Sequence, residues 1–177
     1  MAFETRFTEE EQVLLSSLPA MFGSAMTFAA DSGLATIKEM IASSRTMLDG
    51  SKQFASNEII TAIIPSMASM KDAMNEAKEL REKLQAHLES QKITDKTQMA
   101  ALVIDDAKKI NDLLIAKATP DEADQYKTWI LDIAEDVAKS ASEGGFLGFG
   151  GTQISEVEIA LFADMALALG STRILSC

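Results

Sequence analysis

The sequence contains very few residues of the types that metal sites use. It has one histidine, His87, and one cysteine, Cys177. One cysteine excludes an internal disulfide bond, and a zinc site needs several Cys or His ligands. A di-iron bundle would need Glu-x-x-His pairs, and neither Glu82 nor Glu89 stands at that spacing from the histidine. We therefore expect no metal centre, and we interpret His87 as an ordinary surface or half-buried residue.

Catalytic motifs are missing as well. There is no Gly-x-Ser-x-Gly turn, so a Ser-His-Asp or Cys-His site would depend on the single histidine and distant partners. Carboxylates are plentiful, for example Asp105, Asp106, Asp132, Glu135 and Asp136, but acids on amphipathic helices are usually solvated. The spacing of an EF-hand calcium loop is absent. We expect no cofactor and no enzymatic activity, and an enzyme that uses acids alone is the least favoured alternative.

Basic residues are in the minority. The chain has 16 Lys and Arg against 27 Asp and Glu, a formal net charge of −11. Binding to nucleic-acid phosphates needs clustered Lys and Arg, so a nucleic-acid partner is not expected. Residues 1–12 carry four glutamates where a secretory signal would be basic and then apolar. The most apolar segment, residues 154–169, includes three acids and is shorter than the ~20 residues of a membrane span. These features predict a cytoplasmic protein without a membrane span.

Helix-forming residues dominate what remains. The chain has 177 residues, 47% of them apolar, 24% charged and only three of them proline. Such a chain is long enough to bury a sizeable core and is typical of a globular protein. No run of residues alternates with period two for long, so strands are not expected. The sequence predicts an all-α, single-domain helical bundle of about six or seven helices over residues 1–177.

Several helix starts are marked by capping residues. Thr8 with Glu11 and Ser155 with Glu158 have the spacing of a capping box, and Asn57 precedes another apolar run. Thr119-Pro120-Asp121-Glu122 combines a cap, a proline in the first turn and acids near the positive helix end. Pro19 is expected to break or kink the first apolar helix.

Apolar stripes at helical spacing indicate the faces that pack inward. We expect a helix from about Leu34 to Phe54 and, after Pro65, an amphipathic helix, and Trp129 should anchor the core. The expected stripes include Met21 and Met26, then Met67, Met70 and Met74, and finally Val157, Leu161, Met165 and Leu169. Charge is concentrated in the central helices, which predicts that the first and last helices form the buried layer.

The segment Gly-Gly-Phe-Leu-Gly-Phe-Gly-Gly at residues 144–151 is the longest break in helical periodicity. No strand precedes it and no Lys-Ser or Lys-Thr follows it, so it is neither a P-loop nor a dinucleotide-binding motif. It is either a tight connection whose phenylalanines pack into the core or a loop that docks a partner. The candidate interaction residues are Gly145, Phe146, Leu147, Phe149 and Gly150.

The segment from Trp129 to Leu169 resembles small bacterial all-helical proteins of unknown function. The resemblance depends on Glu143 with the glycine-rich segment and on Ser155-x-x-Glu158, and it implies a bundle in a bacterial cytoplasm. The chain is also faintly similar to tellurite-resistance-type helical domains, which have a Ser-x-x-Glu helix start after a turn. The acidic Asp-Gly turn of those domains is replaced here by Gly150-Gly151-Thr152, so metal binding is not carried over.

These observations favour a non-enzymatic interaction or regulatory module. Our hypothesis is that an apolar groove beside residues 144–154, or the N-terminal helix rich in Met and Phe, docks a partner protein or a second copy of the chain. The alternative is a carrier that holds a hydrophobic small molecule in a cavity between helices.

Overall fold

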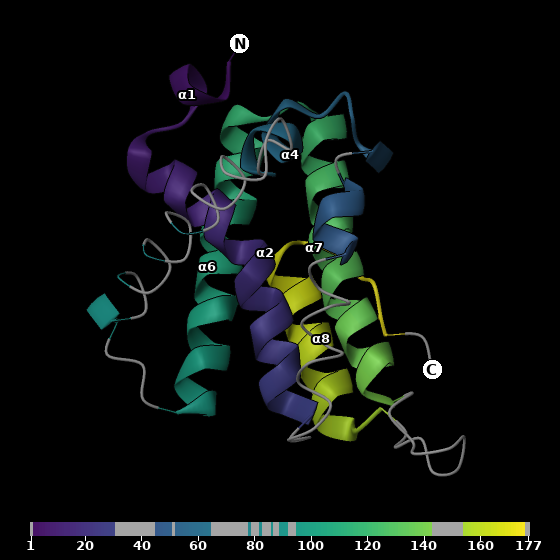
Figure 1. Cartoon of the computed structure of the whole chain (residues 1–177). Coiled ribbons are helices and arrows are strands. Elements are labelled where there is room, and N and C mark those ends of the chain that lie inside the picture. The colour runs from purple at the N-terminus through teal and green to yellow at the C-terminus, as the bar shows by residue number, and fades with distance from the viewer. Residues whose placement is uncertain are drawn as a thin grey trace.

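The chain folds as an all-α bundle, as its composition and periodicity predict (Figure 1). The computed structural model describes residues 2–30, 45–50, 52–64, 95–142 and 154–175, with isolated positions between 78 and 91. Within these ranges there is no strand. The labelled helices are α1 (Phe3–Arg6), α2 (Glu9–Ala30), α4 (Glu58–Ile63), α6 (Lys96–Lys117), α7 (Pro120–Ser142) and α8 (Glu156–Ala168).

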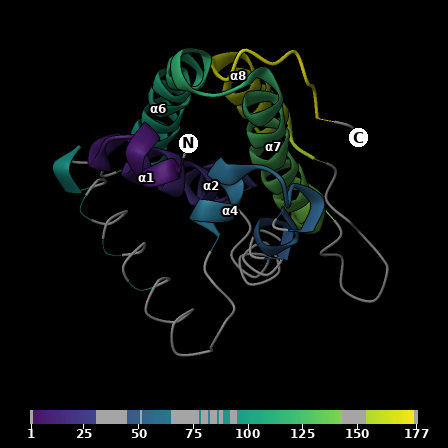
Figure 2. The ribbon, with the colours of Figure 1, turned by 90° about the horizontal axis from the view of Figure 1, so that it is seen from above.

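Helix α2 is the centre of the described bundle. It packs most extensively against α7 and α6, and it also contacts α8. In Figure 1 α2 and α7 run downward while α6 and α8 run upward, so α2 is antiparallel to α6 and α8. The short helices α1 and α4 contact each other at the upper end of the bundle (Figures 1 and 2). The first long helix is therefore central, as the charge distribution predicts, but α7 is as much part of the core as α8.

Of the break or kink expected at Pro19, the break is wrong, because α2 continues through Pro19 as one helix of 22 residues. Proline has no N–H, so the carbonyl of Leu15 loses its usual partner one turn later in the helix. The hydroxyl of Tyr126 on α7 donates to that carbonyl instead, at 2.6 Å. The buried Ser17 donates its own hydroxyl to the carbonyl of Val13 at 2.7 Å. The Leu15 carbonyl and the Ser17 hydroxyl therefore both have hydrogen-bond partners, and the helix continues without a break.

Composition and length alone would allow α2 to cross a membrane. It is the one helix in the described ranges that passes such a test, and half of its most apolar window is buried inside the protein. The core helix of a bundle and a membrane span share this composition. The contacts of α2 with three other helices account for its apolar surface on most sides.

The capping residues are confirmed where they were expected. Asn57 accepts hydrogen bonds from the amides of Ile59 and Ile60, both at 3.1 Å, and so begins α4. The pairs Thr8 with Glu11, Thr119 with Glu122 and Ser155 with Glu158 each exchange side-chain and backbone hydrogen bonds in both directions. These local bonds are readable from the sequence because both partners lie within one helical turn.

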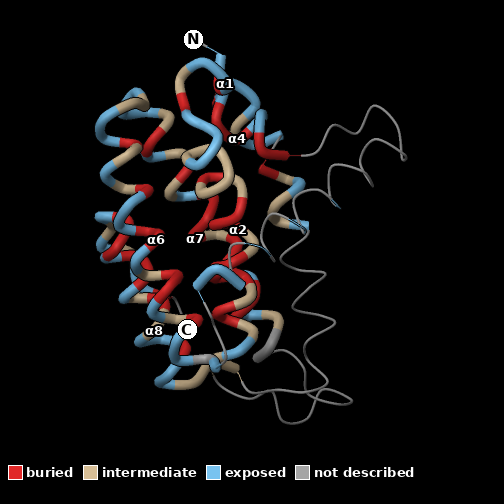
Figure 3. Tube along the Cα trace, turned by 90° about the vertical axis from the view of Figure 1, so that its left-hand side faces the viewer, coloured by how far each residue is buried: buried red, intermediate tan, exposed pale blue. Residues whose placement is uncertain are grey.

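The core is one continuous cluster of apolar residues from all of the labelled helices. Trp129 is 1% exposed, as its place in the α7 stripe predicts, and its ring meets that of Tyr126 edge to face with centroids 5.9 Å apart. Buried positions line the inner sides of the helices, coloured red in Figure 3. Gly50 lies directly against the indole of Trp129, because a Cβ placed there would come within 2.6 Å of the Cδ1 atom.

Candidate functional site

The residues that the sequence suggested as an interaction loop lie outside the described residues. This holds for Gly145, Phe146, Leu147, Phe149 and Gly150. It also holds for His87 and for the stripe of Met67, Met70 and Met74. Their expected roles remain predictions. Of the N-terminal Met and Phe residues, Met21, Phe22 and Met26 are fully buried, whereas Phe28 is exposed.

An apolar groove lies where one end of α2 meets the first turns of α6 and α8. Its volume is about 500 Å³, and eight of its eleven lining residues are apolar. They are Ala25, Phe28, Ala29, Ala100, Ile104, Val157, Ala160 and Leu161, joined by Thr97, Glu156 and Asp164. We call this site the α2–α6–α8 groove. Four of its residues are alanines, and their short side chains leave the helix backbones close to the groove.

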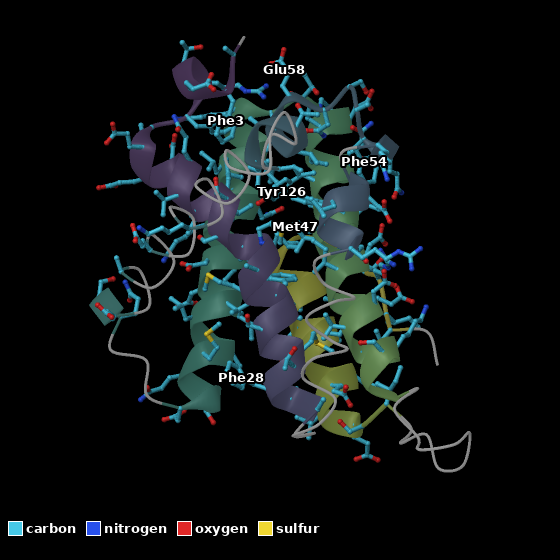
Figure 4. All side chains as sticks on the ribbon, viewed as in Figure 1. Phe3, Phe28, Met47, Phe54, Glu58 and Tyr126 are labelled. Carbon is cyan, nitrogen blue, oxygen red and sulfur yellow. The ribbon has the colours of Figure 1, made fainter. Side chains whose placement is uncertain are left out.

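Two large apolar side chains of the α2–α6–α8 groove face solvent. Phe28 is 54% exposed and Val157 is 63% exposed. Phe28 lies near the lower end of α2 in Figure 4. Exposed apolar residues scattered singly are ordinary, but here both belong to one concave, mostly apolar surface. That combination is the reason for treating the groove as the candidate site.

The position of Val157 corrects the predicted stripe of α8. The sequence placed Val157 and Leu161 on the buried face with Met165 and Leu169. Met165 and Leu169 are buried and Leu161 is partly buried against the core, but Val157 is 63% exposed. The buried face also includes Glu158, Phe162, Ala166 and Ala168. Helix α8 is apolar on nearly every side, so the periodicity of its sequence does not indicate which face is buried.

The rim of the α2–α6–α8 groove is acidic. Glu156 and Asp164 are exposed lining residues, and none of the described lining residues is basic. Within the described part of the chain neither carboxylate has an ion-pair partner. Residues 20–30, 95–105 and 154–164, which form the surrounding turns, hold five acidic residues and one basic residue. The net negative charge of these segments exceeds the partial positive charge at the N-termini of α6 and α8, which begin beside the groove.

A second hollow, of about 670 Å³, lies between the start of α2 and the middle of α6. It is larger but more polar, and two of its carboxylates, Glu11 and Asp106, are already paired within the protein. Lys117 binds Glu11 at 2.6 Å, and Lys109 binds the buried Asp106 at 2.8 Å. The hydrogen bond from Lys117 is also the main reason why the pKa of Glu11 is lowered. Carboxylates that are already paired inside the protein are poor ligands for anything else.

Three acids of α7, Asp132, Glu135 and Asp136, make contacts within the protein, which corrects the expectation that they are only solvated. Arg173 in the C-terminal segment donates to Asp132 at 2.6 Å and also to the buried Glu135. Asp136 accepts a hydrogen bond from Thr46. The pKa of Arg173 is raised, because the hydrogen bonds to both carboxylates outweigh the opposing effect of its own burial. These contacts tie the C-terminal segment and residues 45–50 to α7.

In the described residues no group of three or more His, Cys, Asp or Glu side chains could hold a metal ion. Comparison with known proteins adds no relative: no family model, no curated protein and no solved structure matches the chain. The resemblances noted from the sequence therefore stay predictions. The function has to be argued from the α2–α6–α8 groove itself.

Proposed function

We propose that the protein is a non-enzymatic docking module that binds a helix of a partner protein in the α2–α6–α8 groove. The observation that carries this proposal is the half-exposed ring of Phe28 in a mostly apolar groove. A partner that covers Phe28 and Val157 removes apolar surface from water, at about 25 cal/mol for each Å² buried. Such exposed apolar patches are typical of interaction sites.

The shape of the groove favours a helix as the bound element. The lining residues of each wall recur at helical spacing, with Ala25 and Ala29 on α2 and with Val157, Ala160 and Asp164 on α8. A helix laid along such walls places its own side chains between theirs, as ridges pack into grooves. Recognition by strand addition needs a sheet edge, and the described ranges contain no strand.

The second candidate is a hydrophobic small molecule, because about 500 Å³ is also the size of many ligand sites. The groove is less suited to the most common hydrophobic metabolites with a carboxylate or phosphate head, since both of its charged lining residues are acidic. Native mass spectrometry of freshly purified protein tests this candidate. A retained mass that disappears in the Phe28→Ser variant would favour it over helix docking.

The test of helix docking is the binding of a labelled amphipathic peptide of about 18 residues, which is five helical turns. We expect Phe28→Ser to weaken its binding about tenfold or more while the fold, measured by circular dichroism, is unchanged. The matched control is Ile115→Ser, which removes an apolar residue that is 71% exposed on α6 outside the groove. Equal loss in both variants, or no binding to the unmodified protein, would show that the proposal is wrong.

A further inference from the structure

We infer that the helix bound by the α2–α6–α8 groove is basic, with Lys or Arg beside its apolar stripe. This inference rests on the proposed function, and it specifies the class of partner. It depends on the rim, where Glu156 and Asp164 are exposed and where the lining residues that the structure describes include no Lys or Arg. Both acids lie on α8, so the positive charge of the partner helix belongs on the side that faces α8.

The two acids are available to a partner because nothing in the described part of the chain neutralises them. Some other exposed acids have a basic neighbour, for example Asp105, which lies 3.5 Å from the amine of Lys108. Glu156 and Asp164 have no such neighbour, and α8 contains no basic residue at all. Opposite charges across an interface steer association and select among partners. Among partner helices with the same apolar stripe, the acidic rim therefore favours those that carry Lys or Arg beside the stripe.

The same charges argue against a second copy of this chain as the occupant. Two grooves packed face to face would bring four unpaired carboxylates together around an apolar centre, and like charges in an interface are unfavourable. They equally disfavour an acidic helix and an anionic lipid surface. A basic amphipathic helix satisfies both parts of the surface, because its apolar stripe covers Phe28 and Val157 while its cations meet the rim.

The experiment compares two labelled peptides of about 18 residues with the same leucine stripe at i, i+3, i+4 and i+7. One peptide carries lysines beside the stripe and the other carries glutamates. Fluorescence anisotropy with the full chain at low ionic strength should give a dissociation constant at least tenfold lower for the lysine peptide. The difference should shrink between about 20 mM and 150 mM salt, because exposed charges are screened.

The variant Glu156→Gln with Asp164→Asn should weaken the lysine peptide about three- to tenfold, since each exposed ion pair contributes a fraction of a kcal/mol to about 1 kcal/mol. The matched control is Asp112→Asn with Asp124→Asn, which removes two exposed carboxylates outside the groove. This control should change binding less than twofold. An equal effect of the two double variants would overturn the inference, because attraction would then depend only on the net charge of −11.

The peptides also separate this inference from the proposed function. If both bind equally well and both are weakened by Phe28→Ser, the groove docks helices and only the inferred charge is wrong. If neither binds, or if Phe28→Ser weakens neither, helix docking in this groove is wrong and the inference fails with it.

Discussion

The hydroxyl of Tyr126 donates a hydrogen bond of 2.6 Å to the carbonyl of Leu15, 111 residues earlier in the chain. That carbonyl is the one that Pro19 leaves without a partner inside α2. The bond joins the two helices of the bundle that pack most extensively, and it explains how a proline is tolerated in the middle of a 22-residue helix.

Tyr126→Phe should lower the free energy of unfolding by about 1–3 kcal/mol, because it leaves a buried carbonyl unsatisfied. Urea unfolding followed by circular dichroism measures this change. The informative control is the same substitution in a Pro19→Ala background, where the amide of residue 19 can donate to Leu15. The cost of losing the hydroxyl should be clearly smaller there. An identical cost in both backgrounds would mean that the proline and the tyrosine are not linked.

The ion pair between Arg6 and Glu122 should make stability sensitive to acid. Two hydrogen bonds of 2.9 Å from Arg6 are the main reason why the pKa of Glu122 falls from 4.5 to about 2, with Thr119 adding to the effect against burial. A folded-state pKa below the unfolded one stabilises the protein above pH 4.5, and this contribution is lost as the pH falls toward 2.

The expected loss is about 2–3 kcal/mol over that range, since each pKa unit corresponds to 1.36 kcal/mol and the side chain is partly screened by solvent. Denaturant unfolding at several pH values should show a steeper decline for the unmodified protein than for Glu122→Gln. Parallel curves for the two proteins would contradict the assigned contact with Arg6.

Gly50→Ala should destabilise the protein by about 1–3 kcal/mol through overpacking. The added methyl group would overlap the indole of Trp129, which is the only tryptophan in the chain. Intrinsic fluorescence therefore reports on this contact directly, and the emission should shift to longer wavelength as the ring is displaced. The substitution should cost less in a Trp129→Phe background, which removes the atoms that clash. A neutral effect of Gly50→Ala would show that residues 45–53 do not pack on the ring as described.

Arg173→Ala should release the C-terminal segment from α7 at a cost of about 1–2 kcal/mol, between the values for exposed and buried ion pairs. Hydrogen exchange should speed up at residues 171–175 and leave α6 unchanged. Arg173→Lys should restore only part of the protection, because one amine cannot bind Asp132 and Glu135 in the same forked geometry. Full restoration by lysine would indicate that charge alone holds the segment.

The parts of the fold that depend on short-range chemistry could be predicted from the sequence. The caps at Asn57, Thr119 and Ser155 bond within one turn, and the α7 stripe has a clear helical period. Continuity through Pro19 could not be predicted, because it depends on Tyr126 in another helix. The outward face of Val157 was missed because α8 is apolar on nearly all sides, so its packing partners decide which face is buried.

The measurement that tests the docking function most directly is an NMR titration of the isotopically labelled full chain with the lysine peptide. The account predicts backbone amide shifts concentrated at residues 25–29, 97–104 and 156–164, the three walls of the α2–α6–α8 groove. Shifts centred on the acidic hollow at residues 9–14 and 106–109, or spread over the surface without a focus, would contradict it.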